Sequence, residues 1–467
     1  MKFRTGLLVA GSFVIGIGVG VVAPSMNDAS ARGATGSDVY QQLNLFSKVF
    51  DLVRTDYVFK EPAHKIIYHA LDGMLSGLDP HSSYMNTEQY QNMQAETNGQ
   101  FGGLGIEVSE NGGMIRVVSP IDGTPAAKAG IKAGDIIVAI NGKPTIGLTL
   151  DKAVDKMRGP VGSKIHLTLK RPGDAKAVKV TITRAVIHVD PVKDHLYGNV
   201  GYVRLSTFSE NASDDLKKAL RRLKHEDHGK LRAYVLDLRN NPGGLLNQGI
   251  AVADDFLNSG EIVSTHGRHK TDDEVWYAHH GDMIDGKPLI VMVNSGTASA
   301  AEIVTAALQQ NRRAAVLGVR SFGKGSVQTI FPIQNHGAVR MTTALYYTPS
   351  GKSIQDYGVE PDVKVRETRG KSEQFPLVRE FDMPNAIHNP SGLKAPILPP
   401  PIKLPAAAKT IAPQPPANWP KFERDKASTD YQLQMALKLA RAMAEEGPGA
   451  NGGRQATAQQ HQSGSSN

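Results

Sequence analysis

The sequence predicts an α/β protein that also carries a small β-rich domain and, ahead of it, a pair of helices. Three observations support this fold class. Between residues 198 and 365, apolar runs of strand length alternate with segments of helical period. Between residues 98 and 184, short alternating strands are separated by glycines. With 467 residues, the chain is long enough for two or three such domains.

The first 31 residues are typical of an export segment. Residues 1–4 are basic, residues 6–23 form an uncharged and mostly apolar run, and Ala29-Ser30-Ala31 has the small-x-small pattern that signal peptidases accept. The same run is just long enough to cross a bilayer. We therefore expect residues 1–31 to be either a cleaved signal peptide or a membrane anchor. The expected location is the periplasm or the extracytoplasmic face of a membrane.

The composition is that of a soluble globular protein, with 40% hydrophobic and 21% charged residues. The net charge is +8, but the basic residues are scattered, so we expect no nucleic-acid partner. Cysteine is absent, which excludes disulfides, thiolate metal sites and a cysteine nucleophile. The pairs His266/His269 and His279/His280 have no Cys or Glu at ligand spacing, so we expect no metal site.

Residues 37–97 are predicted to form an N-terminal helical region. Its two helical segments are residues 37–57, with Leu45, Val49, Leu52 and Val53 on one face, and residues 63–78. The motif LDPHSSYM at 78–85 then ends the helical pattern, because it combines a proline with several turn-forming residues.

The glycine-rich stretch at 98–185 is predicted to form the β-rich domain. Near its start, the loop Gly103-Leu104-Gly105-Ile106 precedes a strand, and such a loop can turn several backbone N–H groups toward one point. This creates a site for the terminal carboxylate of a peptide that adds to the domain as an extra strand. The stretch resembles a PDZ domain, which implies recognition of protein C-termini. A hairpin with tight glycine turns is the alternative.

Arg158 ends the helix expected to flank this peptide groove, and Gly159 and Pro160 follow it. One interpretation is regulatory: the guanidinium reaches outside the domain and couples tail binding to a distant active site. The other interpretation is an exposed arginine that is favoured by the helix dipole.

The α/β domain is placed at residues 186–370. Its expected strands are 200–205, 233–238, 289–293 and 315–318, and its expected helices are 213–224, 248–257 and 298–309. Beyond it, residues 371–427 are rich in proline and are predicted to be a linker. A last helix is expected at 428–446, followed by a disordered tail at 447–467 that is rich in Gly, Gln and Ser.

The segment NSGTASAAE at 294–302 follows an expected strand and opens a helix. A serine at such a position, here Ser299, is exposed where the helix N–H groups favour negative charge. An oxyanion formed beside it could accept a hydrogen bond from the Ala300 N–H. These features indicate a nucleophile, although Ser299 or Ser295 could instead be a simple helix cap.

The segment RSFGKGSVQ at 320–328 offers a general base. Lys324 accepts a proton only when it is neutral, which requires burial to lower its pKa from about 10.4. We expect a strand here, on which positions 324 and 328 share a face, so that Gln328 can hold the amine. Serine with lysine is a recognised alternative to the Ser–His–Asp triad.

The same segment partly matches the motif of a nucleotide-binding loop, because residues 318–324 fit the pattern G-x-x-x-x-G-K. That loop requires Ser or Thr at the next position and a helix after it. Here Gly325 occupies the position and a strand is expected to follow, so we expect no nucleotide and no other cofactor.

The segment LDLRNNPGGL at 236–245 ends a buried strand with a glycine turn. Glycine lets the backbone approach a ligand closely, so one of Gly243 and Gly244 is the candidate for the second oxyanion donor. A tight turn without a ligand is the alternative.

Over residues 41–365, these segments resemble the C-terminal processing peptidases, also called tail-specific proteases. The motifs are the PDZ stretch, LDPHSSYM at 78–85, DLRNNPGG at 237–244, GTASAAE at 296–302, SFGKGSVQ at 321–328 and YYTPSGKSIQ at 346–355. The resemblance implies a crotonase-like α/β serine peptidase core with Ser299, Lys324 and Gln328 as its active site. It also implies that residues 103–106 form the carboxylate-binding loop. Ala301 departs from the family, which commonly has a further, non-attacking serine there.

The expected function is therefore that of an exported serine endopeptidase that recognises the C-terminal tails of protein substrates through its PDZ domain. The alternative is a catalytically silent PDZ-based adaptor or chaperone, which would lack Ser299 or Lys324. A trypsin-like protease would need a GNSGG-type motif with upstream His and Asp, and we find none. The sequence leaves open whether an adaptor protein, membrane association or a homo-oligomer is involved.

Overall fold

The computed structural model describes residues 36–446, except for 112–113, 121–122, 133, 149, 172–175, 189, 370–378, 391–401 and 423–425. The expected export segment at 1–31 and the expected tail at 447–467 lie outside the described residues. The chain divides into two units, Met1–Ile67 and Tyr68–Asn467. None of the helices among the described residues is both long and apolar enough to span a bilayer.

Helix α1 (Gly36–Asp56) lies in the first unit, and α2 (Ala63–Ser76) begins there and continues into the second. Both helices lie close to the segments predicted from periodicity. The apolar side chains predicted to share one face of α1 are exposed to solvent; they are Leu45, Val49, Leu52 and Val53. Helix α1 therefore carries an uncovered apolar stripe.

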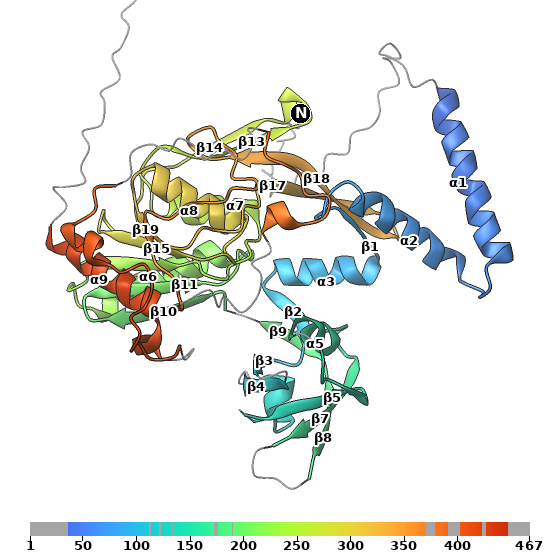
Figure 1. Cartoon of the computed structure of the whole chain (residues 1–467), viewed down its shortest axis with the longest axis horizontal. Coiled ribbons are helices and arrows are strands. Elements are labelled where there is room, and N and C mark those ends of the chain that lie inside the picture. Colours follow the sequence, from blue (N-terminus) through green and yellow to red (C-terminus); the bar gives the residue numbers. More distant parts are fainter. Residues whose placement is uncertain are drawn as a thin grey trace, which may run out of the picture. The chain divides into compact units, whose positions relative to one another are not determined.

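The β-rich domain begins and ends with a two-stranded ribbon, in which β2 (Gln100–Gly103) pairs antiparallel with β9 (Ala185–His188). Its main sheet has the order β3-β4-β5-β7-β8, with β6 on β5 (Figure 1). The strands are β3 (Ile106–Asn111), β4 (Met114–Pro120), β5 (Ile136–Ile140), β6 (Lys143–Pro144), β7 (Lys164–Lys170) and β8 (Val178–Thr183), and the helices are α4 (Pro125–Lys128) and α5 (Leu150–Met157). Alternate residues of β7 (Ile165, Leu167 and Leu169) point into one hydrophobic core, as the period of two predicts.

The α/β domain is built on a six-stranded sheet of order β10-β11-β12-β15-β16-β19, in which only β10 and β11 pair antiparallel. The strands are β10 (Val192–Tyr197), β11 (Val200–Leu205), β12 (Ala233–Asp237), β15 (Leu289–Val293), β16 (Ala315–Gly318) and β19 (Val363–Lys364). The helices are α6 (Ala212–Glu226), α7 (Leu246–Asp254), α8 (Ala300–Gln310) and α9 (Tyr431–Glu445). The predicted α/β class is confirmed.

Helices cover both faces of this sheet, and the sequence of β15 shows why. Leu289, Val291 and Val293 enter the core shared with α6, α7 and α8, whereas Ile290 and Met292 enter the core shared with α9. Because successive side chains of a strand point to opposite faces, a strand buried on both sides must be apolar throughout. The continuous apolar run of β15 therefore follows from its place in the middle of the sheet.

A second, antiparallel sheet has the order β1-β18-β13-β14, with β17 also paired to β18. Its strands are β1 (Ser83–Met85), β13 (Glu261–Gly267), β14 (Glu274–Tyr277), β17 (Ser326–Ile333) and β18 (Gly337–Tyr347). The motif LDPHSSYM thus ends in β1, at the edge of β18, and α3 (Thr87–Thr97) follows it. Short 3-10 turns complete the fold: η1 (Lys270–Asp272), η2 (Glu380–Asp382), η3 (Ala406–Thr410) and η4 (Ala427–Thr429).

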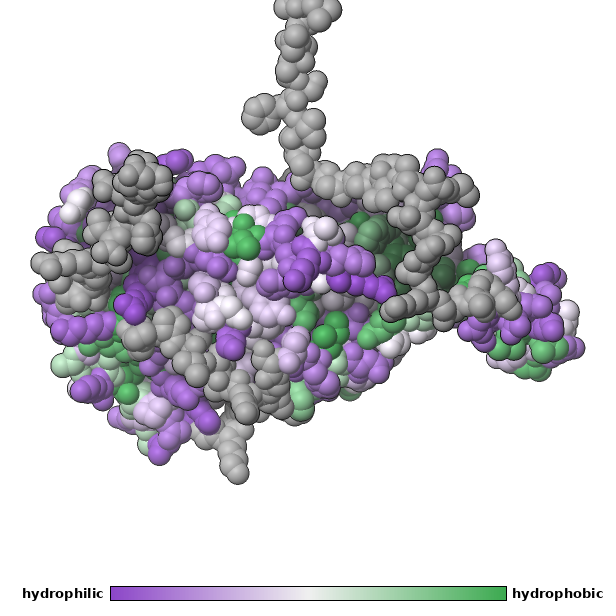
Figure 2. Space-filling model, turned by 90° about the horizontal axis from the view of Figure 1, so that it is seen from above, coloured by the Kyte–Doolittle hydropathy of each residue, from purple (hydrophilic) through white to green (hydrophobic). Residues whose placement is uncertain are grey.

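The C-terminal segment packs on the sheet. Ile402 and Ile411, which fall in the stretch predicted to be a linker, are buried in the same core as Leu433 and Leu437 of α9. Helix α9 is therefore a structural layer of the α/β domain. The surface of the protein in the view of Figure 2 carries mainly hydrophilic side chains with apolar ones scattered among them, as the composition predicts.

Candidate active site

Ser299 occupies the turn between β15 and the first residue of α8. Its backbone has φ +56° and ψ −123°, a conformation that is strained for a residue with a Cβ atom. Its carbonyl oxygen accepts the Glu302 N–H at 2.8 Å, so the first turn of α8 closes on the main chain of Ser299. A serine that only caps a helix adopts an ordinary extended backbone. The strain therefore favours a functional role for Ser299.

Glu302, one turn into α8, joins the serine turn to the lysine loop. Its carboxylate accepts the N–H groups of Ser299 (2.9 Å), Gly323 (2.8 Å) and Lys324 (3.0 Å) and the hydroxyl of Ser321 (2.5 Å). Complete burial raises the pKa of Glu302 to about 7, and the four donors oppose that rise. Glu302 belongs to the motif GTASAAE, but this role was not predicted from the sequence.

The loop 237–244 lies directly against Ser299. A Cβ atom at Gly243, whose φ is +98°, would approach the Ser299 Cβ to 2.7 Å, so the close contact requires glycine. The Gly243 N–H donates to Asn241 Oδ1 at 2.9 Å. Among the described residues, no group accepts the N–H of Gly244 or of Ala300. Gly243 is thus near Ser299 with an occupied N–H, and which glycine would donate to an oxyanion stays a prediction.

Hydrogen bonds join this loop to the serine turn at three places. Thr297 Oγ1 donates to the Leu238 carbonyl at 2.8 Å, and the Ala298 N–H donates to the Asn241 carbonyl at 2.9 Å. Asn240 and Asn294 exchange two bonds of 2.9 Å, one from the Asn240 N–H and one from Asn294 Nδ2. A shift of one loop must therefore shift the other.

Lys324 precedes β17 instead of lying on it, because the strand begins at Ser326. The expectation that position 324 belongs to a strand is therefore wrong: the Gly323 and Lys324 N–H groups bond to Glu302, not to a neighbouring strand. Burial lowers the pKa of Lys324 to about 8, and the positive charge of Arg340 lowers it further, whereas the negative charge of Glu380 raises it. In the described part of the chain, its Nζ has no hydrogen-bond partner.

Gln328 is held by hydroxyl groups. Its Nε2 donates to Ser326 Oγ at 3.0 Å and to Thr342 Oγ1 at 3.2 Å, and Thr342 Oγ1 in turn donates to Asp79 Oδ1 at 3.1 Å. The pairing of β17 with β18 shifts register between Val327 and Gln328, which breaks the simple alternation used to align positions 324 and 328. Among the described residues, Gln328 makes no hydrogen bond to Lys324. Instead, it connects β17 to the turn of LDPHSSYM.

Glu380 is a second buried carboxylate near the lysine loop, and it lies in the stretch predicted to be a linker. Its Oε1 accepts from Gln355 Nε2 at 3.1 Å, and both of its oxygens lie within 2.9 Å of His81 Nε2. Gln355 Oε1 accepts the Gly325 N–H at 2.7 Å, and the Tyr346 hydroxyl donates to the Lys324 carbonyl. These contacts enclose the lysine loop, and periodicity in the sequence gives no signal for them.

The glycine loop of the β-rich domain has the geometry expected for a carboxylate site. Leu104 is buried in the domain core, its carbonyl accepts the Ala126 N–H at 2.9 Å, and Gly105 has φ +74°. A Cβ atom at Gly105 would approach Thr124 to 2.3 Å. Within the described residues, the N–H groups of Leu104 and Gly105 are unpaired. They are therefore available to an anionic ligand.

Arg158 reaches outside the β-rich domain. Its Nη1 lies 2.7 Å from Oε1 of Glu96, which belongs to α3, and both side chains are about half exposed. The histidines considered as metal ligands make separate contacts, His266 with Asp273 and His279 with Asp254. In the part of the chain that the structure describes, no group of three His, Asp or Glu side chains is placed to hold a metal ion.

Comparisons with known proteins agree with this architecture. The model of peptidase family S41 matches residues 199–365, and the PDZ domain model matches residues 116–171. A carboxy-terminal-processing protease of Bartonella bacilliformis is 53% identical over 331 residues, which cover 71% of this chain and 76% of the relative. The carboxy-terminal processing protease CtpA of Bacillus subtilis is 36% identical over 333 residues, 71% of this chain and 70% of the relative. The solved photosystem II D1 C-terminal processing protease is 29% identical, with 69% of this chain and 92% of that chain covered and a TM-score of 0.42.

Proposed function

Because this chain belongs to the C-terminal processing proteases of peptidase family S41, we propose that it cleaves proteins with Ser299 as nucleophile and Lys324 as general base. One observation carries the assignment. The buried carboxylate of Glu302 binds the backbone N–H groups of both residues, at 2.9 and 3.0 Å, and so fixes the two turns relative to each other. A serine in a strained turn at the start of a helix and a lysine of lowered pKa are the parts that a serine–lysine site requires.

In the proposed reaction, the neutral Lys324 amine takes the hydroxyl proton of Ser299 while Oγ attacks the carbonyl carbon of the scissile bond. The negative charge that develops on the carbonyl oxygen lies at the N-terminus of α8, where the Ala300 N–H and one glycine N–H of the loop 237–244 stabilise it. The Lys324 ammonium then protonates the leaving amine as the C–N bond breaks. Water, deprotonated by the same amine, releases the acyl group and regenerates Ser299.

Gln328 belongs to this proposal as an orienting group for the base. A lysine with a pKa of about 8 is roughly one-tenth neutral at pH 7, so a sufficient fraction of the protein holds a competent base. The Gln328 amide carries no charge and cannot repel or neutralise the amine. Its anchoring to Ser326 and Thr342 fixes where the amide can meet Lys324 once substrate is bound.

The assignment is tested with Ser299→Ala and Lys324→Ala on an unfolded protein substrate. Each variant is expected to lose cleavage while keeping the fold, as measured by circular dichroism. The double variant is expected to be no worse than either single one, because the two residues act as a unit. Wild-type cleavage by purified Lys324→Ala protein would contradict the role of the lysine, and cleavage near the wild-type rate by Ser299→Ala would contradict that of the serine.

For substrate choice, we propose that the PDZ domain binds the C-terminal tails of substrates at residues 103–106. The N–H groups of Leu104 and Gly105, which are unpaired within the described residues, support this proposal, since they can donate to a terminal carboxylate. A substrate with a free C-terminal carboxylate is expected to be cleaved faster than the same substrate with a C-terminal amide. Equal rates for the two would remove the case for recognition of the tail.

The contact of Arg158 with Glu96 supports a coupling between tail binding and catalysis. Helix α3 connects the β1 turn to the PDZ domain, and its C-terminal Thr97 carbonyl accepts the Glu210 N–H at 3.0 Å. Arg158→Ala and Glu96→Gln are expected to reduce cleavage stimulated by a tail peptide more than they weaken binding of that peptide. If both variants are stimulated normally, Arg158 is a surface residue, since exposed pairs contribute little.

We further propose that the protein acts outside the cytoplasm, on the basis of the basic start, apolar run and Ala29-Ser30-Ala31 motif. Fractionation of cells that express the full chain tests this location, and the N-terminal sequence of the recovered protein distinguishes cleavage from anchoring. The adaptor protein, the membrane association and the homo-oligomer stay predictions.

A further inference from the structure

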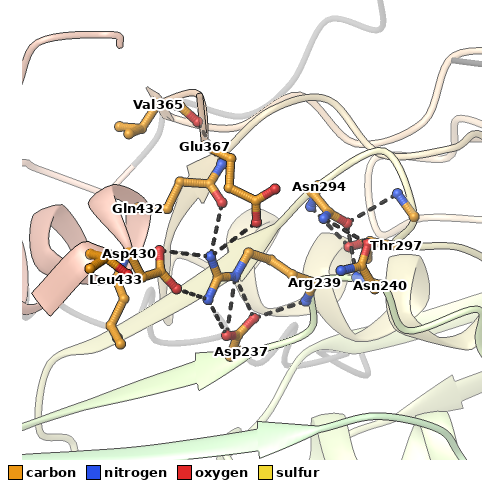
Figure 3. Close-up of polar contacts among 12 residues, drawn as sticks. Asp237, Arg239, Asn240, Asn294, Thr297, Val365, Glu367, Asp430, Gln432 and Leu433 are labelled. Carbon is orange, nitrogen blue, oxygen red and sulfur yellow. Dashed lines mark hydrogen bonds and ion pairs between the residues drawn. The ribbon is translucent and has the colours of Figure 1, made fainter. Parts of the chain in front are cut away.

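A buried ionic cluster lies at the end of β12, and Arg239 is at its centre (Figure 3). The guanidinium, with 4% of the residue exposed, binds the Asp237 carboxylate through Nε at 2.9 Å and Nη2 at 2.7 Å. It also binds both oxygens of Asp430, at 2.7 and 3.1 Å, and Oε1 of Gln432 at 3.1 Å. Buried charges of this kind are stable only when they are fully paired.

The Asp430 carboxylate both caps α9 and binds Arg239. It is the N-cap residue of α9, where its Oδ1 accepts the Leu433 N–H at 3.0 Å, and the same carboxylate binds Arg239. Gln432 in the first turn of α9 donates to the Val365 carbonyl at 2.7 Å. The first turn of the last helix is therefore fastened to a residue that precedes it by 191 positions.

Arg239 begins the loop that lies against Ser299. Burial opposes ionisation of Asp237, but the charge and hydrogen bonds of Arg239 prevail and hold its pKa below the usual value, so the pair is ionic. The Arg239 N–H also bonds to Asp237 Oδ1 at 3.0 Å, which fixes the backbone where the strand ends. The next residue, Asn240, has φ +55° and exchanges bonds with Asn294 of the serine turn, as Figure 3 shows beside the cluster.

From these contacts we infer that Asp430 is a positioning residue for the peptidase reaction. It holds Arg239 in place and, through Arg239, the loop that presents Gly243 and Gly244 beside Ser299. The inference rests on the proposed function, because it assumes that this loop serves the Ser299 oxyanion. Helix α9 thereby completes the active site from the opposite face of the sheet, although none of its residues needs to touch substrate.

The size of the effect follows from the mechanism. Removing the Asp430 carboxylate leaves Arg239 with Asp237 and with the partly exposed Glu367, whose Oε1 lies 3.5 Å from Nη1. The guanidinium must then move to regain a close partner or water. A displacement of about 1 Å in a catalytic group can cost roughly a hundredfold in rate, and loss of one oxyanion donor costs about 10² to 10³. We therefore expect kcat to fall by about ten- to a hundredfold, with KM unchanged because the substrate-binding surfaces are intact.

Asp430→Ser is the informative variant, since serine is also a good N-cap and α9 keeps its first turn. Asp430→Glu is the conservative variant that keeps the charge. Lys438→Met is the matched control on α9, because Lys438 is exposed and, among the described residues, its amine donates only to Thr410 Oγ1, at 3.2 Å. The measurements are kcat and KM on a fluorogenic peptide, the melting temperature, and the affinity of a peptide boronate that forms a tetrahedral adduct on serine.

The inference predicts that Asp430→Ser loses kcat and boronate affinity in parallel, that its KM and melting temperature stay near wild type, and that Asp430→Glu recovers much of the loss. Wild-type kcat in Asp430→Ser, while Ser299→Ala is inactive in the same assay, overturns the inference and leaves the proposed function intact. A kcat loss that follows a lowered melting temperature, with unchanged boronate affinity in the folded fraction, overturns it as well. Activity in Ser299→Ala shows instead that the proposed function has failed.

Discussion

The two sides of the candidate site are built in different ways. On the nucleophile side, the Ser299 turn and the loop 237–244 are joined by hydrogen bonds at three places and lie in close contact through Gly243. On the base side, the Lys324 backbone is fixed by Glu302, but its amine has no hydrogen-bond partner among the described residues. In the proposed mechanism, the groups that would meet developing charge are thus preorganised, whereas the contact for proton transfer would form only when substrate binds.

Glu302 is hydrogen-bonded to both the nucleophile side and the base side of the candidate site. Its replacement is therefore expected to have the largest effect on activity. Glu302→Gln keeps the shape but replaces one acceptor oxygen with an NH₂ group, which then faces either the Ser299 and Lys324 N–H groups at the Oε2 position or the Gly323 N–H and Ser321 hydroxyl at the Oε1 position. Buried donors that lose their acceptor destabilise that arrangement. We expect activity to fall by at least about a hundredfold, the scale for a lost oxyanion donor.

Single-turnover kinetics on a peptide ester and on the matching amide measure the effect of Glu302→Gln on acylation. Loss on both substrates is expected, because the nucleophile and the base are displaced together. The control is Glu226→Gln, the same exchange at the exposed last residue of α6, whose carboxylate makes no hydrogen bond or ion pair among the described residues. Retention of near wild-type acylation by Glu302→Gln would show that the two turns hold their positions without it.

Thr342→Val tests how the hydrogen bonds of Gln328 support the base side of the candidate site. The variant keeps the shape of the threonine and removes the hydroxyl that links Gln328 to Asp79. Because Gln328 then keeps only Ser326 as a partner, we expect kcat to fall by about tenfold, which corresponds to roughly 1.4 kcal/mol. KM on a short peptide is the accompanying measurement and should stay constant.

The matched control for Thr342→Val is Thr343→Val on the same strand. Its hydroxyl pairs at 2.6 Å with that of Thr329 and with no residue of the proposed site. This control should leave kcat within about twofold of wild type, since surface substitutions of this kind usually change the free energy of unfolding by less than about 0.5 kcal/mol. Equal losses in the two variants would indicate a general effect on the sheet.

The smallest expected effect is a change in the pH profile. Lysine is a base only when neutral, so kcat/KM should rise with pH through a midpoint near the Lys324 pKa of about 8. The negative charge of Glu380 stabilises the ammonium and raises that pKa, so Glu380→Gln should move the midpoint to lower pH. Arg340→Gln removes a positive charge and should move it to higher pH. Shifts of both variants in the same direction would contradict the assignment of the midpoint to Lys324.

The central sheet could be predicted from the sequence because its strands are buried on both faces. The bounds expected for β11, β15 and β16 match the structure. β15 and β16 are uninterrupted apolar runs, whereas β11 contains one charged residue, Arg204. The strands of the antiparallel sheet show a weaker hydrophobic pattern in the sequence. Most residues of β17 and β18 are partly exposed, so neither a continuous run nor a clean alternation marks them.

The site could be predicted only where its residues are local. Ser299 and Gly243 lie in short motifs, and the Ser-x-x-Glu spacing that ends at Glu302 is a capping-box signal that indicates a side chain bonded to the Ser299 N–H. Glu380 and Asp430 could not be found in this way. Their partners lie 299 and 191 residues away in the chain, and no local period encodes such contacts.

The late position of Asp430 also has a consequence for the time at which the enzyme becomes active. A nascent chain emerges from its N-terminus, and 191 further residues must follow Arg239 before Asp430 exists. Until α9 docks, Arg239 lacks both contacts with the Asp430 carboxylate, and the loop beside Ser299 is held less firmly. An unfinished chain is therefore expected to be a poor protease until its last helix is made.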